Sequence, residues 1–358
     1  MSANDIIARR VSGRLWALMV LILGVVPARF DAAAFDCSKA ISPTEKRICA
    51  DPWLVKVDEE MVTLYQNIIQ NGKDVQGWKA DQHAWLIERG HCEDDYCLHQ
   101  EYQDRLVLLR ATARPAQWAG HWWRVDASGA NPSELVITHP TPNSFSFDLN
   151  ADAGVHHRPA PQSGELTGKA IRDSSTTAHY KGTVQSDTEH CSLAFRRTLN
   201  RLIIEQDGSG TDCGAGDIVS YDGTYVTAAA DPNPAPDLLL LGVVDTSAQD
   251  NACRKLLGKD YDMMVATDNV PDQPDNLDGN GATVVGMHSD LDTCNGKWVL
   301  MYDAKGHQWA AVWDSLSNRQ GIVELRYYTN VISDKQILPK TISAEECPGE
   351  TVRVRMMP

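Results

Sequence analysis

The sequence lacks the short motifs that mark common catalytic and metal centres. It contains no G-x-S-x-G, no H-E-x-x-H, no P-loop, no dinucleotide-binding glycine motif and no C-x-x-C pair. Their absence excludes the familiar nucleophile elbow, zinc helix, nucleotide loop and zinc ribbon, whereas a catalytic pair scattered along the chain would leave no such trace. We therefore predict a protein that is not an enzyme and that has neither a cofactor nor a metal site.

Basic side chains are also scarce. The chain has 33 Lys and Arg against 48 Asp and Glu, which gives a formal net charge of -15. Residues 1–34 hold four of the basic and two of the acidic residues, so the remainder has a net charge of -17. Such a charge disfavours nucleic acid and attracts basic proteins. The solubility of an exported protein, however, explains this negative charge as well as, or better than, a basic partner does.

Long apolar runs are confined to the N-terminus. Three of the first 14 residues are arginine, an apolar stretch follows over 15–26, and small residues fill 32–34. This order indicates a cleavable signal peptide over 1–34, because a membrane-spanning helix needs about 20 apolar residues. A lipid-anchored protein would have cysteine directly after a small residue, whereas Cys37 follows Asp36. We expect a periplasmic or secreted protein without stable membrane insertion after cleavage.

Nine cysteines in an exported chain indicate disulfide bonds. The odd number leaves one thiol unpaired, and we expect that thiol to be buried. The eight predicted structural cysteines are Cys37, Cys49, Cys92, Cys97, Cys191, Cys213, Cys294 and Cys347.

Two of the pairings are suggested by position. Cys191 and Cys213 flank one predicted hairpin, and we pair them. Cys294 and Cys347 are the remaining candidates toward the C-terminus, with Cys253 as an alternative partner for either.

Residues 35–115 predict a small helical domain. A capping box with proline at the first helical position, Ser42-Pro43-Thr44-Glu45, begins a first helical turn. A second start at Asp51-Pro52 opens an apolar stripe that recurs at steps of three and four through Ile68. Two further amphipathic patterns run over 78–86 and 98–109, and the stripes need each other to be buried.

The first four cysteines all lie at predicted helix ends, and they allow three pairings. Cys37 with Cys49 and Cys92 with Cys97 would be local. Either crossed scheme would tie the first turn to the last helix and constrain the unfolded chain more, by roughly 3 to 4 kcal/mol for each long loop. The sequence does not choose among them.

These residues together resemble the N-terminal domain of LprI-type lysozyme inhibitors. In that family a cysteine precedes a Glu-x-x-Ile-Cys turn, an Asp and a Tyr punctuate the next helix, and a Trp precedes a second cysteine pair. The matching elements are 35–37, 44–51, Asp58, Tyr65, 82–86, Cys92, Cys97 and Tyr102. The resemblance covers about a fifth of the chain and implies an exported protein that binds a lysozyme or a related peptidoglycan hydrolase.

The stretch between Cys92 and Cys97 contains the candidate partner-binding residues Glu93, Asp94 and Asp95. A loop with a cysteine on each side would present these carboxylates to a basic partner with little ordering cost. The alternative is that Asp94 or Asp95 merely caps the third helix. In the same domain we expect Glu45 and Arg105 to form a structural ion pair between the first turn and the last helix.

Residues 116–230 change to short strand-like runs separated by turn signals, which predicts an antiparallel β sandwich or barrel. Trp118, Trp122 and Trp123 open this region, and we assign them to its core rather than to a binding ledge. The proline-rich segment 231–237 predicts a linker.

Residues 238–358 predict an α+β domain, with a helix after Thr246 and several later strands. An acidic, turn-rich segment over 270–281 has oxygen ligands of the kind that calcium takes, with Asn276, Asp278 and Asn280 at EF-hand-like spacing. The position of the closing glutamate falls on Met287, so we favour an ordinary loop without metal.

The sequence as a whole predicts an exported binding protein that inhibits lysozyme or a related peptidoglycan hydrolase by steric and electrostatic occlusion. The alternative is a structural or interaction protein of the cell envelope, in which the LprI-like domain is a stable accessory.

Overall fold

The structure is a computed structural model. It describes residues 36–111, 117–126, 128–153, 162–182, 190–265, 270–272, 274–288, 294, 296–315 and 321–358. The predicted signal peptide, residues 1–34, lies outside the described residues. None of the described helices is both long enough and apolar enough to span a membrane.

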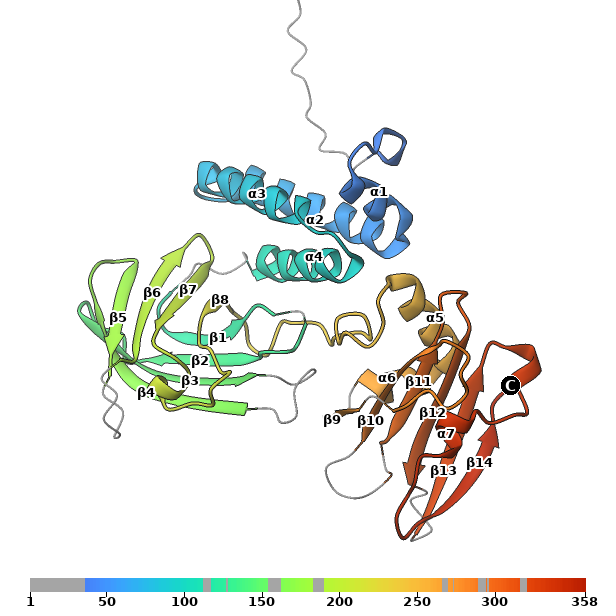
Figure 1. The fold of residues 1–358 in the computed structure, drawn as a ribbon. Helices are drawn as coiled ribbons and strands as arrows, with labels where there is room; N and C mark the ends of the chain where they lie inside the picture. Colours follow the sequence, from blue (N-terminus) through green and yellow to red (C-terminus); the bar gives the residue numbers. More distant parts are fainter. Residues whose placement is uncertain are drawn as a thin grey trace, which may run out of the picture. The chain divides into compact units, whose positions relative to one another are not determined.

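The N-terminal part is helical, as predicted (Figure 1). Its elements are η1 (Cys37–Lys39), α1 (Pro43–Ala50), α2 (Pro52–Asn71), α3 (Val75–Gly90) and α4 (Asp95–Arg110). We call residues 36–111 the helical module.

Each helix of this module begins at a polar cap. The Ser42 hydroxyl accepts a hydrogen bond from the Glu45 amide, and the Glu45 carboxylate accepts one from the Ser42 amide, which confirms the predicted capping box. Asp51, Asp74 and Asp94 cap α2, α3 and α4 in the same way, because each carboxylate accepts from an amide of the first turn. The apolar faces then bury a shared core that includes Leu54, Trp78, Trp85, Leu98, Tyr102 and Leu106.

The disulfides of the helical module are the local ones. Cys37 is bonded to Cys49 and Cys92 to Cys97, at sequence separations of 12 and 5. The crossed schemes that the sequence left open are therefore absent, and packing rather than a covalent link joins α1 to α4.

The central part is a closed, eight-stranded antiparallel barrel, so of the two predicted architectures the barrel is found. Its strands are β1 (Gly120–Arg124), β2 (Ser133–Thr138), β3 (Ser144–Ala153), β4 (Gln162–Arg172), β5 (Thr177–Lys181), β6 (Ser192–Thr198), β7 (Arg201–Asp207) and β8 (Gly223–Thr227). Each strand pairs with the next, and β8 pairs with β1 to close the ring.

The barrel interior is filled by side chains rather than by a channel. Phe145, Phe195 and Tyr225 are buried there together with Trp122, because alternate residues of each strand point inward. Trp118 is also buried, and Trp123 is half-buried with its indole N–H donating to the Ala228 carbonyl. After β7 the chain passes η3 (Thr211–Cys213), where Cys213 is bonded to Cys191.

The C-terminal part is a mixed six-stranded sheet with short helices, in the strand order β14-β13-β12-β11-β10-β9. The strands are β9 (Val270–Asp272), β10 (Thr283–His288), β11 (Trp298–Tyr302), β12 (Gln308–Ser315), β13 (Ile322–Thr329) and β14 (Thr351–Met356), and the helices are α5 (Ser247–Leu257), η4 (Gly258–Asp260), α6 (Tyr261–Val265), η5 (Ile332–Asp334) and α7 (Lys340–Ser343). Among the described strands of this sheet, β13 and β14 alone pair in parallel.

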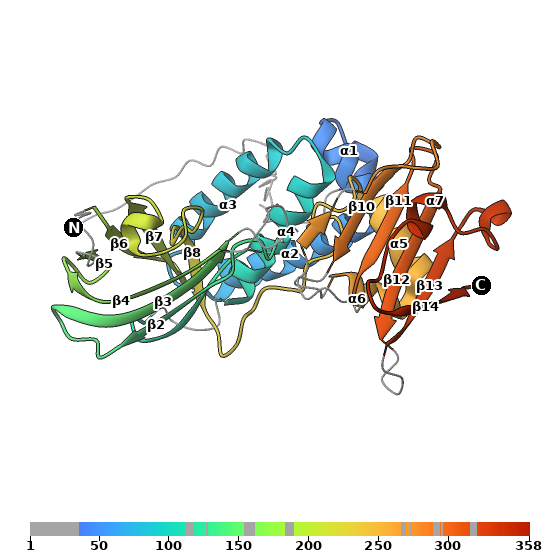
Figure 2. The ribbon, with the colours of Figure 1, turned by 60° about the horizontal axis from the view of Figure 1, so that its bottom comes forward.

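The sheet is buried on both faces, which explains its continuous apolar strands. Trp298, Leu300 and Tyr302 pack with α5 and α6 on one face, whereas the alternate residues Val299 and Met301 pack on the other face with α7 (Figure 2). Cys294 and Cys347 form the remaining disulfide, and Cys253 on α5 is the buried free cysteine.

One buried ion pair holds α3 against α4, and it differs from the pair we expected. Glu45 is occupied as the cap of α1, so the predicted pairing of Glu45 with Arg105 is wrong. Arg105 is fully buried and donates instead to Asp81 at 2.6 Å and to Gln82 at 2.6 Å, both on α3. Asp81 also accepts from Arg201 of β7 at 2.9 Å.

The charge of Asp81 is held by these two arginines. Burial alone would raise the pKa of Asp81, but the nearby Arg201 and Arg105 outweigh it, so the pKa lies below its usual value of 3.8. The stabilisation from this shift is present above about pH 3.8 and is lost as the pH falls through the lowered pKa.

We predict that Asp81→Asn lowers the free energy of unfolding at pH 7 by about 2 to 4 kcal/mol, because it leaves the buried Arg105 without a countercharge. Chemical denaturation followed by helical circular dichroism measures this loss. The matched control is Glu60→Gln, which breaks the exposed pair with Arg110 and should cost less than about 0.5 kcal/mol. Equal losses in both variants, or a D81N deficit that does not shrink as the pH falls below 3.8, would contradict this account.

Candidate functional site

The three predicted partner-binding carboxylates lie in and after the loop between α3 and α4, which the Cys92–Cys97 disulfide closes. Asp94 accepts a hydrogen bond from the Cys97 amide at 2.8 Å and so caps α4. Asp95 accepts from the amide of Ser247, at 3.3 Å, and from its hydroxyl, at 3.2 Å. Partner binding by these three residues stays a prediction, and Glu93 is the exposed one whose carboxylate no described residue bonds.

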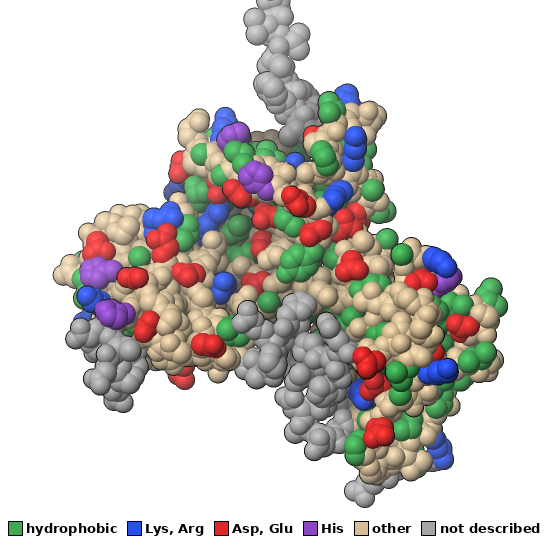
Figure 3. All heavy atoms as spheres, viewed as in Figure 1, with side chains coloured by type: hydrophobic (Ala, Val, Ile, Leu, Met, Phe, Trp, Pro, Cys, Tyr) green, Lys and Arg blue, Asp and Glu red, His purple; other side chains and the backbone are tan. Residues whose placement is uncertain are grey.

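Two further carboxylates, which the sequence did not suggest, lie on the same helices. Burial raises the pKa of Glu101 on α4, and the nearby charge of Glu88 on α3 raises it further. We call Glu88 and Glu101, together with Glu93 in the loop that joins their two helices, the acidic face. Figure 3 shows several acidic side chains on the side of the helical module that this view presents.

Apolar side chains accompany the acidic face. Leu86 and Ile87 on α3 are 39% and 47% exposed. The pair directly precedes Glu88 on α3, and apolar side chains together with carboxylates have the mixed composition of a protein-binding surface. Helix spacing alone did not reveal this, because it shows which residues share one helix face but not which positions of two helices meet.

Asp58 and Tyr102, two residues of the LprI-like pattern, lie in the interior of the module. The Tyr102 hydroxyl donates to Asp58 at 2.7 Å and accepts from Arg89 at 2.8 Å. Burial raises the pKa of Tyr102, so the phenol stays protonated. Arg89 also lies over the Trp85 ring, with 5.2 Å from its guanidinium carbon to the ring centroid. This network joins α2, α3 and α4 and is closed to a substrate.

A His–Asp pair is buried in the same module. The ring of His99 lies 2.7 Å from the Asp51 carboxylate and stacks on Trp53 at 4.2 Å between centroids. Burial raises the pKa of Asp51, but hydrogen bonds from His99 and Ser247 outweigh it and hold the pKa below its usual value. Because His99 is 4% exposed, this pair has no access to a substrate and acts as a structural support for the start of α2.

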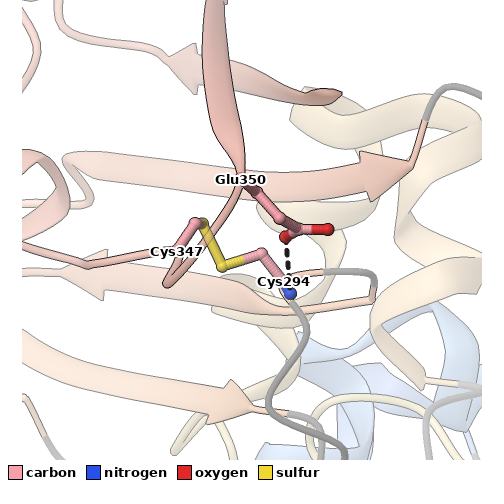
Figure 4. A group of neighbouring side chains, drawn as sticks. All are labelled: Cys294, Cys347 and Glu350. Carbon is pink, nitrogen blue, oxygen red and sulfur yellow. Dashed lines mark hydrogen bonds between the residues drawn. A yellow bond between two sulfur atoms is a disulfide. The ribbon is translucent and has the colours of Figure 1, made fainter. Parts of the chain in front are cut away.

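One group among the described residues has the close spacing of metal ligands, namely Cys294, Cys347 and Glu350 (Figure 4). The two sulfur atoms are bonded to each other, and the Glu350 carboxylate accepts a hydrogen bond from the Cys294 amide at 3.1 Å. Cysteine binds a metal as the thiolate, and the disulfide leaves neither sulfur in that form. In the oxidised protein this group therefore has a structural role.

The segment with EF-hand-like spacing, residues 276–280, is held to the start of α7 by hydrogen bonds. Asp278 accepts hydrogen bonds from the amides of Lys340, at 2.8 Å, and Thr341, at 3.0 Å. Burial raises the pKa of Asp278, but these bonds outweigh it and lower the pKa overall. Asn276 in turn accepts from the Asp278 amide. These polar groups therefore stabilise the local fold by internal hydrogen bonds. The side chain of Asp272 lies outside the described residues.

The free cysteine is shielded from chemistry. Cys253 is fully buried on α5, and its sulfur accepts a hydrogen bond from the Gln308 amide group at 3.0 Å. Burial, assisted by the negative charge of Asp250, raises the pKa of Cys253 to about 12. A thiol with this pKa is not an activated nucleophile.

We predict that the oxidised native protein shows no rapid reaction with a thiol reagent at pH 8, and that one thiol per chain reacts after denaturation. Burial and the raised pKa of Cys253 both suppress the thiolate that would attack the reagent. Absorbance of the released chromophore measures the stoichiometry. Fast labelling of one thiol in the native protein would contradict the assignment of Cys253 as buried and free.

Comparison with known proteins gives one partial similarity. The chain is 31% identical over 87 residues to Lipoprotein LprI of Mycobacterium bovis and of two strains of Mycobacterium tuberculosis. The match covers 23% of this chain and 43% of each relative, so the chain spans less than half the length of the curated relatives that it matches. No family profile and no solved structure matches the chain.

Proposed function

We propose that the exported protein binds a lysozyme or a related peptidoglycan hydrolase and inhibits it by covering its cleft, without turnover. The observation that carries this proposal is the similarity to the LprI lipoproteins, together with the LprI-type cysteine, Asp, Tyr and Trp pattern in the helical module. The four disulfides support a location outside the cytoplasm.

Charge supports the choice of a basic partner. Residues 35–358 have a net charge of -17, and such a field speeds the approach of a cationic protein at low salt. The acidic face offers a specific place for contact, because the raised pKa of Glu101 reflects burial and repulsion that a partner's Lys or Arg would relieve.

Rigidity supports occlusion as the mechanism. The Cys92–Cys97 bond and the Asp94 cap fix the loop that presents Glu93, so that little conformational entropy is lost when a partner binds. The apolar pair Leu86 and Ile87 would bury area beside these charges. The His–Asp and Tyr–Asp pairs of the module are buried, which favours binding over catalysis in this proposal.

We predict that the purified oxidised protein inhibits lysis of peptidoglycan by at least one of the c-type, g-type and i-type lysozymes in a dose-dependent way. Inhibition should weaken between 20 and 150 mM salt, since attraction between exposed charges is screened over about 10 Å at 0.1 M. The triple variant E88Q/E93Q/E101Q should raise the inhibition constant at least tenfold.

The matched control removes the same charge from the outer face of the barrel. Asp148, Asp152 and Glu165 are exposed there, so D148N/D152N/E165Q should inhibit nearly as well as the unchanged protein. Equal loss in both triple variants would show a general charge effect and exclude the acidic face as the contact. No inhibition of any lysozyme by the folded protein would reject the proposal in favour of a cell-envelope interaction protein.

A further inference from the structure

The C-terminal sheet ends in a strand whose outer side is open. β14 comes first in the strand order β14-β13-β12-β11-β10-β9, and Figure 1 and Figure 2 show it at the margin of the sheet. Among the described strands, β13 is the one that pairs with it. The exposed residues of β14 are Thr351, Arg353, Val354 and Arg355. An exposed edge strand of this kind can accept a further strand.

Hydrogen bonding to β13 uses alternate residues of β14. The Thr351 amide donates to the Gly321 carbonyl at 2.7 Å. At the other end of the strand, the Met357 amide donates to the Tyr327 carbonyl at 2.8 Å. Because successive residues of a strand direct their N–H and C=O groups to opposite sides, the residues of the other parity face away from β13. These outward-facing residues are Val352, Val354 and Met356.

The edge is basic in a chain that has an excess of negative charge. Arg353 and Arg355 are both exposed and, as alternate residues of one strand, lie on the same face of the sheet. The Glu324 carboxylate of β13 lies 3.8 Å from the Arg355 guanidinium and 3.7 Å from that of Arg326. One shared carboxylate is thus the countercharge that the described residues give to the two arginines of β14.

β13 shows what kind of neighbour β14 accepts. Glu324 lies on the face of the sheet that carries the arginines of β14, whereas Val323 and Leu325 lie on the opposite face. On that opposite face they belong to the same apolar cluster as Val352 and Met356. A strand on the outer side of β14 meets the same two faces. The complementary sequence therefore alternates acidic and apolar residues.

Pairing of β14 with its own copy is disfavoured by charge. In an antiparallel pair of two copies that bond through their outward-facing residues, Val354 lies opposite itself, so Arg353 of one copy lies opposite Arg355 of the other. Like charges in directly opposed positions destabilise a sheet. Positive side chains on edge strands protect against such self-association, and here they leave the edge selective for an acidic strand.

We propose that β14 binds an extended acidic peptide, with alternating acidic and apolar residues, that adds to the sheet as a further strand. The main chain of the peptide exchanges hydrogen bonds with Val352, Val354 and Met356. Its carboxylates pair with Arg353 and Arg355. This surface lies in the C-terminal part and does not depend on the proposed inhibition of lysozyme.

Fluorescence polarisation of a labelled hexapeptide of alternating glutamate and valine, titrated with the full oxidised protein at low salt, tests the proposal. We expect saturable binding of this peptide. Alternating lysine and valine, which has the wrong charge, should bind at least about tenfold more weakly. A block of glutamates followed by a block of valines, which has the same composition without the alternation, should also bind at least about tenfold more weakly. Equal binding of the three peptides, or no binding of the first, overturns the proposal.

Hydrogen exchange detected by NMR locates the bound peptide. The amides of Val352, Val354 and Met356 should exchange more slowly when the alternating acidic peptide is present, because new hydrogen bonds protect them. The amides of Arg353 and Arg355 already face β13 and should change little. Binding without slower exchange at the outward-facing amides overturns the placement. Slower exchange there on raising the protein concentration without peptide shows pairing between copies and also overturns the proposal.

Two variants separate the main chain from the charge. Val354→Pro removes one outward-facing N–H and no bond to β13, a position at which edge strands tolerate proline, so this variant should lose peptide binding. R353Q/R355Q should weaken binding at least about fivefold, because it removes two cross-strand charge pairs. The matched control is K255Q/K305Q, because Lys255 and Lys305 are exposed elsewhere in the C-terminal part. Equal losses in the arginine and lysine variants overturn the assignment.

The arginine variant keeps the test decisive where Val354→Pro does not fold. R353Q/R355Q changes exposed side chains alone, so its circular dichroism should match that of the unchanged protein. Unchanged peptide affinity in this folded variant, or in folded V354P, overturns the proposal.

Discussion

The buried contact between Arg105 and Asp81 is the constraint on which the arrangement of the helical module depends. A guanidinium inside a helix bundle needs a carboxylate nearby, because burying an unpaired charge is costly. Asp81 satisfies Arg105 from α3 and at the same time accepts from Arg201 at the start of β7. In the adjoining turn, Asn200 donates to the Leu108 carbonyl and Leu199 packs on the helical core. One carboxylate therefore serves both the bundle and its contact with the hairpin.

Local structure followed from the sequence, whereas distant partners did not. The capping box at Ser42 and the helix start at Asp51 depend on residues within four positions of each other, and both are found. The choice between barrel and sandwich depends on whether β8 reaches β1, a contact about a hundred residues apart that no local pattern records. The partner of Arg105 was mistaken for the same reason. Glu45 was already occupied by local amides, and helix packing brought Asp81 into place.

The candidate site likewise combines local features, which the sequence predicts, with contacts between residues that are far apart in the sequence. Proximity in sequence singled out the loop of Glu93, Asp94 and Asp95 and also offered the alternative of a helix cap, which is found at Asp94. It did not reveal the hydrogen bonds from Ser247 to Asp95, which join residues far apart in the sequence. Glu88 and Glu101 come together only when α3 and α4 pack. The candidate surfaces arise from tertiary contacts, whereas the positions of the helix caps arise from local ones.

The disulfides have a consequence for how the chain matures. The pairs are Cys37–Cys49, Cys92–Cys97, Cys191–Cys213 and Cys294–Cys347, so each bond joins cysteines that are consecutive except for the skipped Cys253. A chain that crosses a membrane from its N-terminus presents its thiols in that order. Simple oxidation of each new thiol with the previous one then produces the first three native bonds without later reshuffling. The one point of hazard is Cys253, because the strands β11, β12 and β13 that bury it follow Cys294 in the chain, so that its thiol is not yet enclosed by them when Cys294 emerges.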